Sequence, residues 1–357
     1  MPFQNAQDFP LWLNAGLFLI AAAIVWGAGT RLARYVDTIS DKTGLGKVFV
    51  GMLLLGVITS LPEIANVLTA SITGNPALAV NNLLGSAAIN VLLLAIADAA
   101  IGREAVTGNV AQPSTLMMST LCIMVLVAVA MALTTGDVEV FGVGLWSVGL
   151  CLFSIGAFWL TARYEDRAAW KVTDEGRDDD EDAGGGEDSE EGADKSLRSL
   201  IIKTVIAGVV ILAAGYTLSQ TGDALAEQTG IGTGMVGFAL IGLATSLPEL
   251  SSVVEAIRLR QYEMAFGQVL GTNFVNLSLI LLADLVYQKG PVINELGDFE
   301  VISALLGATL IGVFLVGLLE RRDRTVMKMG WDSLAVMVLF AGGLVLLYFV
   351  GGTSQQG

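Results

Sequence analysis

A five-residue sequence that occurs twice constrains this chain more than any other feature. Thr-Ser-Leu-Pro-Glu stands at 59–63 and again at 245–249, each time inside an apolar stretch. Proline breaks helices and a carboxylate is costly within lipid, so a membrane protein that keeps both, at two places, is expected to use them. Interrupted hydrophobic segments at matching positions of two halves indicate a transport site.

The duplication extends beyond this motif at the same offset, 245 − 59 = 186 residues. Identical residues recur at this offset for Gly29, Asp37, Gly56, Leu84, Gly85, Asn90, Ala97 and Asp98, which match Gly215, Asp223, Gly242, Leu270, Gly271, Asn276, Ala283 and Asp284. A constant offset without gaps predicts an internal repeat.

Composition indicates a membrane protein with many spans, because 54% of the residues are hydrophobic and only 15% are charged. Spans of about 20 residues cross the hydrocarbon. Ten are predicted at 10–29, 48–71, 77–100, 114–134, 138–162, 199–220, 232–257, 262–286, 299–319 and 331–350. Five spans per half is an odd number, so the second copy would enter the membrane from the opposite side. The expected fold is therefore an all-α membrane protein of ten transmembrane helices in two inverted-topology five-helix repeats, 1–162 and 199–357, joined by a linker at 163–198.

The basic residues predict the orientation. With both termini outside, 18 of the 19 lysines and arginines fall on the cytoplasmic side, and Lys289 alone falls outside. The expected location is the cell (inner) membrane, and the N-terminus has no basic region typical of a cleaved signal peptide. Between Arg163 and Leu197 there are 14 acidic and 5 basic residues without an apolar pattern, which predicts a disordered cytoplasmic tether; a regulatory cation site there is the less favoured alternative.

Two further acids, Asp98 and Asp284, also repeat in apolar sequence. They lie beyond the motif on opposite sides of the predicted membrane, and we interpret them as interfacial or vestibule charges with a structural role favoured. Cys122 and Cys151 lie inside apolar spans and are interpreted as small hydrophobic residues. The sequence contains no histidine, which excludes histidine-based catalysis and metal binding.

The predicted site combines the two motifs with a second pair of segments. Pro62 and Pro248 should break their helices near Ile58 and Ala244, and helical spacing places the threonine, serine and glutamate of each motif on one face. The segments Gly85-Ser86…Asn90 and Gly271-Thr272…Asn276 add a hydroxyl and an amide four residues apart. The ten candidate ligands are Thr59, Ser60, Glu63, Ser86, Asn90, Thr245, Ser246, Glu249, Thr272 and Asn276. Oxygen ligands of this kind suit Ca²⁺, Na⁺ or Mg²⁺. A structural alternative is that the serines, threonines and asparagines only hydrogen-bond neighbouring helices, and that the glutamates are neutral buried acids.

With two G-x-x-T-S-x-P-E segments, each followed by G-S/T-x-x-x-N, the chain resembles the calcium/cation antiporter superfamily, the sodium/calcium exchangers and their prokaryotic relatives. Gly56 to Glu63 and Gly242 to Glu249 carry the resemblance, and Ile58, Ala87 and Ile89 depart from the usual pattern. The resemblance implies that Glu63 and Glu249 are shared between Ca²⁺ and Na⁺, with the eight neutral residues completing the sites. It also implies alternating access by sliding of spans one and six. Asn276, where some exchangers have an acid, argues against a potassium-linked subtype.

The predicted function is secondary active exchange of Ca²⁺ for Na⁺ by an ion transporter, not an enzyme. Coupling to H⁺, or exchange of another divalent ion such as Mg²⁺, is the nearest alternative. A passive cation channel and an intramembrane aspartyl protease using Asp98 and Asp284 are remote ones. No cofactor is expected besides the transported ions. Membrane lipid is the expected surrounding, with no nucleic acid and no obligate protein partner.

Overall fold

The computed structural model describes residues 6–43, 59–101, 113–165, 197–258, 261–320, 325–326 and 329–354, and these are almost wholly helical. The long helices are α1 (Leu11–Thr43), α4 (Pro76–Ile101), α5 (Pro113–Thr135), α6 (Leu145–Glu165), α7 (Leu197–Thr229), α11 (Tyr262–Val286), α12 (Asp298–Glu320) and α13 (Trp331–Ser354). The short helices are η1 (Ala6–Asp8), α3 (Leu61–Ile72), α8 (Thr233–Met235), the π-helical η4 (Val236–Ile241), α9 (Gly242–Thr245), α10 (Leu247–Arg258) and η5 (Val292–Glu295). The strands are β1 (Glu139–Val140), β2 (Val143–Gly144), β3 (Thr325–Val326) and β4 (Met329–Gly330).

The protein is a multi-pass membrane protein. Within the described residues, seven helices are long and apolar enough to cross a membrane, and an eighth span forms if Thr233–Thr245 and Leu247–Arg258, which meet at a bend of 50°, are counted together. The ten predicted spans are not all confirmed. The apolar part of α6, Leu145–Thr161, is shorter than a full span, and residues 48–58 of the predicted second span lie outside the described residues.

The predicted fifth span, 138–162, begins too early. Residues 139–144 form the hairpin β1–β2, and α6 starts only at Leu145. Phe141 and Gly142 have φ values of 54° and 82°, which a right-handed helix cannot contain. The apolar sequence here therefore turns back before the helix begins. The linker predicted at 163–198 lies mostly outside the described residues, which include only its ends.

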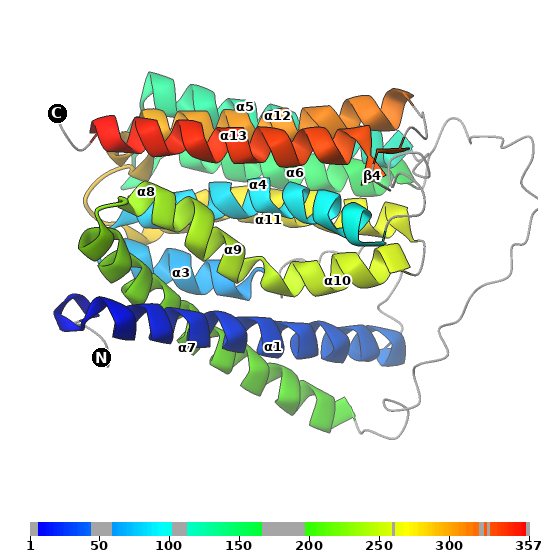
Figure 1. Ribbon diagram of the computed structural model, residues 1–357, viewed down its shortest axis with the longest axis horizontal. Coiled ribbons are helices and arrows are strands. Elements are labelled where there is room, and N and C mark those ends of the chain that lie inside the picture. Colours follow the sequence, from blue (N-terminus) through cyan, green and yellow to red (C-terminus); the bar gives the residue numbers. More distant parts are fainter. Residues whose placement is uncertain are drawn as a thin grey trace, which may run out of the picture.

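Two helices lie at the centre of the molecule. In their most apolar stretches, 78% of α4 and 67% of α11 is buried, against 22% for α1 and for α7. Figure 1 shows α4 and α11 in a middle layer, with α5, α6, α12 and α13 on one side and α1, α7 and the short helices α3 and α8–α10 on the other. The polar residues of α4 and α11 are therefore enclosed by protein, while α1 and α7 lie at the periphery.

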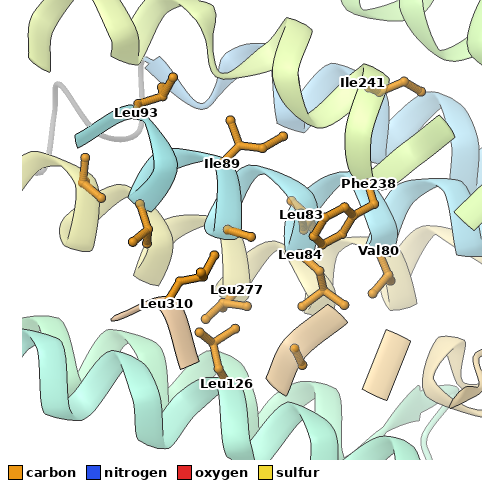
Figure 2. Close-up of a cluster of buried hydrophobic side chains, with 14 of the residues drawn as sticks. Val80, Leu83, Leu84, Ile89, Leu93, Leu126, Phe238, Ile241, Leu277 and Leu310 are labelled. Atoms are coloured by element: carbon orange, nitrogen blue, oxygen red, sulfur yellow. The ribbon is translucent and has the colours of Figure 1, made fainter. Parts of the chain in front are cut away.

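Apolar side chains fill the space around α4 (Figure 2). Leu84 of α4, Leu126 of α5 and Leu310 of α12 are at most 1% exposed. Phe238 of η4 is fully buried and makes an edge-on contact with Phe299, with ring centres 6.5 Å apart. This packing joins the bent segment to α4 and α12, so the polar residues between them are held in a close-packed environment.

The two hairpins occupy matching places in the chain, because β1–β2 pairs Glu139 with Gly144 and β3–β4 pairs Thr325 with Gly330, each 186 residues further on. Each hairpin is held by an aspartate of the other half. The Gly144 N–H donates to Asp284 (2.6 Å), and the Gly330 N–H donates to Asp98 (2.9 Å).

Both aspartates are therefore structural. Asp284 also accepts a hydrogen bond from the Val292 N–H (2.6 Å), and Asp98 accepts one from the Ser333 hydroxyl (2.6 Å). Asp98 is 1% and Asp284 2% exposed, which agrees with the structural role favoured from the sequence and not with open vestibule charges. A buried carboxylate needs hydrogen-bond donors, and the sequence alone did not reveal that hairpin backbone would supply them.

Candidate cation site

Both proline motifs begin a helix in the same way. Ser60 (φ −80°, ψ 7°) precedes α3, and Ser246 (φ −85°, ψ 3°) separates α9 from α10. Each serine carbonyl accepts the first hydrogen bond of the helix that follows, from Ile64 (2.9 Å) and from Leu250 (3.3 Å). The break near Ala244 was predicted two residues too early, and Ile58 lies outside the described residues.

The two glutamates lie one residue after these prolines, in the first turns of α3 and α10, and both are fully buried. Their carboxyl groups are close enough for an electrostatic interaction with each other. Two acids from distant parts of the chain therefore converge inside the protein. Such a pair is unfavourable when both groups are charged, unless a cation lies between them or a proton neutralises one of them.

Hydroxyl groups surround the Glu63 carboxyl. The Ser86 hydroxyl on α4 donates to Glu63 (3.2 Å) and lies 3.1 Å from the Thr245 hydroxyl at the end of α9. The contacts cross between the halves, since Thr245 interacts with Glu63 and Thr59 interacts with Glu249. Each glutamate thus meets the threonine of the other motif.

Amide side chains complete the arrangement. The Ser60 hydroxyl donates to Asn276 (3.1 Å), and Asn90 donates to Asn273 (3.2 Å). Asn273 in turn donates to the carbonyl of Ala87 (3.1 Å), the residue that matches it at an offset of 186. These bonds bring α4 and α11 together at the glutamates.

The structure places all ten predicted residues in one buried region, each at most 2% exposed. Sequence reasoning missed three polar neighbours, Asn82, Asn273 and Gln268. The signal was present for two of them, because Asn82 and Gln268 lie four residues before Ser86 and Thr272 and match each other at the offset. For Asn273, the matching residue is an alanine, so the repeat gave no indication.

Among the residues that the structure describes, several buried oxygens of this region have no hydrogen-bond partner of good geometry: Glu63 Oε2, both carboxylate oxygens of Glu249, Ser246 Oγ, Thr272 Oγ1 and Asn90 Oδ1. Buried polar atoms are normally satisfied, so a cluster of unsatisfied oxygens indicates a site for an ion or water. Oxygens from carboxylates, hydroxyls and amides are hard ligands that suit Ca²⁺, Mg²⁺ or Na⁺. Within the described residues, no group of three or more acidic, cysteine or histidine side chains is placed to hold a metal, so neutral oxygens would have to complete the coordination.

The peripheral helices contact the broken segments through glycine. A Cβ atom at Gly29 of α1 would lie 2.5 Å from the ring of Pro248, and one at Gly215 of α7 would collide with Ala65 of α3. Gly29 and Gly215 match at the offset of 186. Only residues without a side chain let α1 and α7 cross this closely beside the glutamates.

Comparison with known proteins shows similar chains in both sequence and fold. In sequence, the chain is 26% identical to the inner membrane protein YrbG of Escherichia coli over 275 residues, 75% of this chain and 78% of that protein. In structure, it resembles an H⁺/Ca²⁺ exchanger, CAX, with a TM-score of 0.65 and 13% identity, covering 95% of this chain and 86% of that one. It also resembles the sodium-calcium exchanger NCX_Mj, with a TM-score of 0.58 and 16% identity, covering 94% and 99%.

The model of the family described as sodium/calcium exchanger protein matches residues 13–164 and 198–350, which is most of the chain and includes both proline motifs. Its members are ion exchangers. The chain belongs to the sodium/calcium exchanger protein family.

Proposed function

We propose that this protein is a secondary active antiporter that exchanges Ca²⁺ for Na⁺ by alternating access. The observation that carries the proposal is the convergence of Glu63 and Glu249, both fully buried, beside hydroxyl and amide oxygens that lack hydrogen bonds. Two carboxylates balance the charge of one Ca²⁺, and the neutral oxygens add to its coordination. The proposed ligands are the ten residues named from the sequence.

Coupling to H⁺ is the second candidate, since the CAX structure has a higher TM-score than NCX_Mj. A proton needs only a carboxylate, whereas a desolvated Na⁺ needs several neutral oxygens. Eight neutral candidate ligands beside two acids therefore favour Na⁺ as the coupling ion, with Mg²⁺ as an alternative divalent cargo.

The proposal includes two halves related by a pseudo-two-fold axis in the membrane plane, with both termini outside and the acidic linker in the cytoplasm. It is supported by the constant offset of 186, the matching breaks at Ser60 and Ser246, and the reciprocal hairpin contacts of Asp98 and Asp284. Two inverted copies would present equivalent surfaces to the two sides of the membrane, which is the geometry that alternating access requires.

The test is isotope flux into liposomes that contain the purified protein, with Na⁺, K⁺ and pH gradients varied independently. We expect Ca²⁺ uptake to follow the Na⁺ gradient alone. Uptake that follows only the pH gradient would show that the coupling ion is H⁺ and not Na⁺. Uptake that follows neither gradient would reject the antiporter hypothesis.

Substitutions test the site directly. Glu63→Gln and Glu249→Gln are expected to reduce flux to that of protein-free liposomes, because each removes one of two charges that balance the divalent ion. Glu255→Gln is the matched control, since Glu255 lies on α10 with Glu249 but is exposed. Normal flux in either site variant, with the elution profile of the folded protein, would contradict the assignment.

A further inference from the structure

The central helices α4 and α11 carry matching rows of polar side chains. On α4 the row is Asn82, Ser86 and Asn90, and on α11 it is Gln268, Thr272 and Asn276, with members four residues apart. Residues at this spacing lie on one face of a helix, one turn apart. Asn82 and Gln268 are the end members, so each lies about one turn, ~6 Å along the helix axis, from the neighbouring hydroxyl of the row, Ser86 or Thr272.

At Asn82 the amide oxygen has a hydrogen-bond partner, whereas the amide nitrogen has none among the described residues. The Thr245 hydroxyl donates to Asn82 Oδ1 (3.1 Å), and the same hydroxyl lies 3.1 Å from the Ser86 hydroxyl. A side chain at Gly85, between them on α4, would collide with the Phe238 carbonyl of η4. The segment that contains η4 and α9 is therefore packed directly on α4 and tied to it at Asn82.

At Gln268 the corresponding contacts are not made. Gln268 is 7% exposed, and neither its oxygen nor its nitrogen has a hydrogen-bond partner in the part of the chain that the structure describes. The same is true of the Thr272 hydroxyl. Thr59, which matches Thr245, interacts with Glu249 instead. Within the described residues the two sets thus have different contacts, because Gln268 lacks partners for both of its amide atoms whereas Asn82 lacks one only for its nitrogen.

We infer that Asn82 and Gln268 are a matched pair of positioning residues that hold the two motif threonines in turn. In the state seen here, Asn82 holds Thr245 and closes the outer side of the site. In the opposite state, Gln268 holds Thr59 and closes the inner side, while Asn82 releases Thr245. A buried amide without partners is unfavourable, so the hydrogen bonds that Gln268 gains offset those that Asn82 loses.

This inference rests on the proposed alternating access and on its orientation. If α4 runs inward from outside, Asn82 lies on the outer side of Ser86, and Gln268 lies on the inner side of Thr272. Neither residue is among the ten proposed ligands. Because the Asn82–Thr245 and Gln268–Thr59 contacts form alternately, the site would open to one side only after it has closed to the other.

A single-cysteine reporter tests the inference without requiring transport. Ser246→Cys is placed in a background of Cys122→Ala and Cys151→Ala, since Ser246 is a buried residue of the second motif. A membrane-impermeant thiol reagent is then added to one face or the other of oriented proteoliposomes that contain the full chain. The ratio of the outer to the inner labelling rate reports which side is open.

Asn82→Ala is expected to raise this ratio about twofold to tenfold, the change that corresponds to one net hydrogen bond. Gln268→Ala is expected to lower it by a similar factor, and the double variant should return close to the starting ratio. Asn82→Leu, which keeps the branched shape but not the acceptor, replaces Asn82→Ala if the latter does not fold.

Equal changes in labelling from both faces, or shifts in the same direction for Asn82 and Gln268, would overturn the inference, because a purely structural role predicts no opposition between them. The labelling ratio does not depend on the transported ion. Failure of Na⁺-driven Ca²⁺ flux alone would therefore reject the proposed function and leave the opposed labelling shifts as a separate result.

Discussion

Replacing Asp98 by alanine tests whether the aspartates at the far ends of α4 and α11 hold the fold or carry ions. Asp98 accepts hydrogen bonds from the Gly330 N–H and the Ser333 hydroxyl, at 2.9 and 2.6 Å. Asp284 accepts two from the N–H groups of Gly144 and Val292, at 2.6 Å each. Both aspartates are therefore buried, and each accepts at least two hydrogen bonds.

A hydrogen bond to a charged group contributes about 1.5–3 kcal/mol, so the loss of two predicts a destabilisation of about 3–6 kcal/mol for Asp98→Ala. For a chain of this length, the apparent midpoint of thermal unfolding should fall on the order of 5–10 °C. Asp98→Asn keeps an acceptor oxygen and loses the charge, so a smaller fall is expected. Asp284→Ala should resemble Asp98→Ala, because it breaks the equivalent contact in the other half.

The assay is thermal unfolding of the purified protein in detergent, followed by the loss of the monodisperse peak at a fixed heating rate. Asp8→Ala is the control, because Asp8 is exposed. Flux per folded molecule should be retained in Asp98→Ala. An unchanged midpoint of unfolding together with a loss of flux would refute the structural role and would indicate that Asp98 takes part in ion transport.

Two further predictions concern packing. Gly29→Ala is expected to reduce Ca²⁺ flux, because the new methyl group would lie 2.5 Å from the ring of Pro248. The control is Gly16→Ala on the same helix, whose methyl group would meet nothing within 4 Å, so this variant should transport normally. Equal flux in the two variants would contradict a close crossing at Gly29. The two carboxylate oxygens of Glu300 accept hydrogen bonds from the Asn81 amide (2.6 Å) and from the Gly297 N–H (2.7 Å). Glu300→Gln keeps only one acceptor oxygen, so it should lower the free energy of unfolding by about 1–3 kcal/mol. Thermal unfolding measures this loss, and unchanged stability would show that these bonds contribute little.

The membrane class and the members of the buried polar cluster could be predicted from sequence, because both depend on local chemistry. A proline interrupts a helix whatever surrounds it, and an acid beside that interruption, repeated at a constant offset, marks a functional position. All ten candidate residues accordingly lie together in the structure. The hairpin at 139–144 was missed because apolar periodicity does not distinguish the end of a span from a short apolar turn.

The sequence by itself determined the family, the two interrupted segments and the composition of the buried polar cluster, since each depends only on residue types and their spacing. Only the tertiary structure decided what these residues contact. The hydrogen-bond donors to Asp98 lie 232 and 235 positions further along the sequence, and Thr245 and Asn82 are 163 positions apart. Two matching amides, Asn82 and Gln268, have different hydrogen bonds within the described residues. Repeated sequences have the same local preferences, but a packed molecule can satisfy equivalent residues unequally, because hydrogen bonds depend on how distant helices are placed.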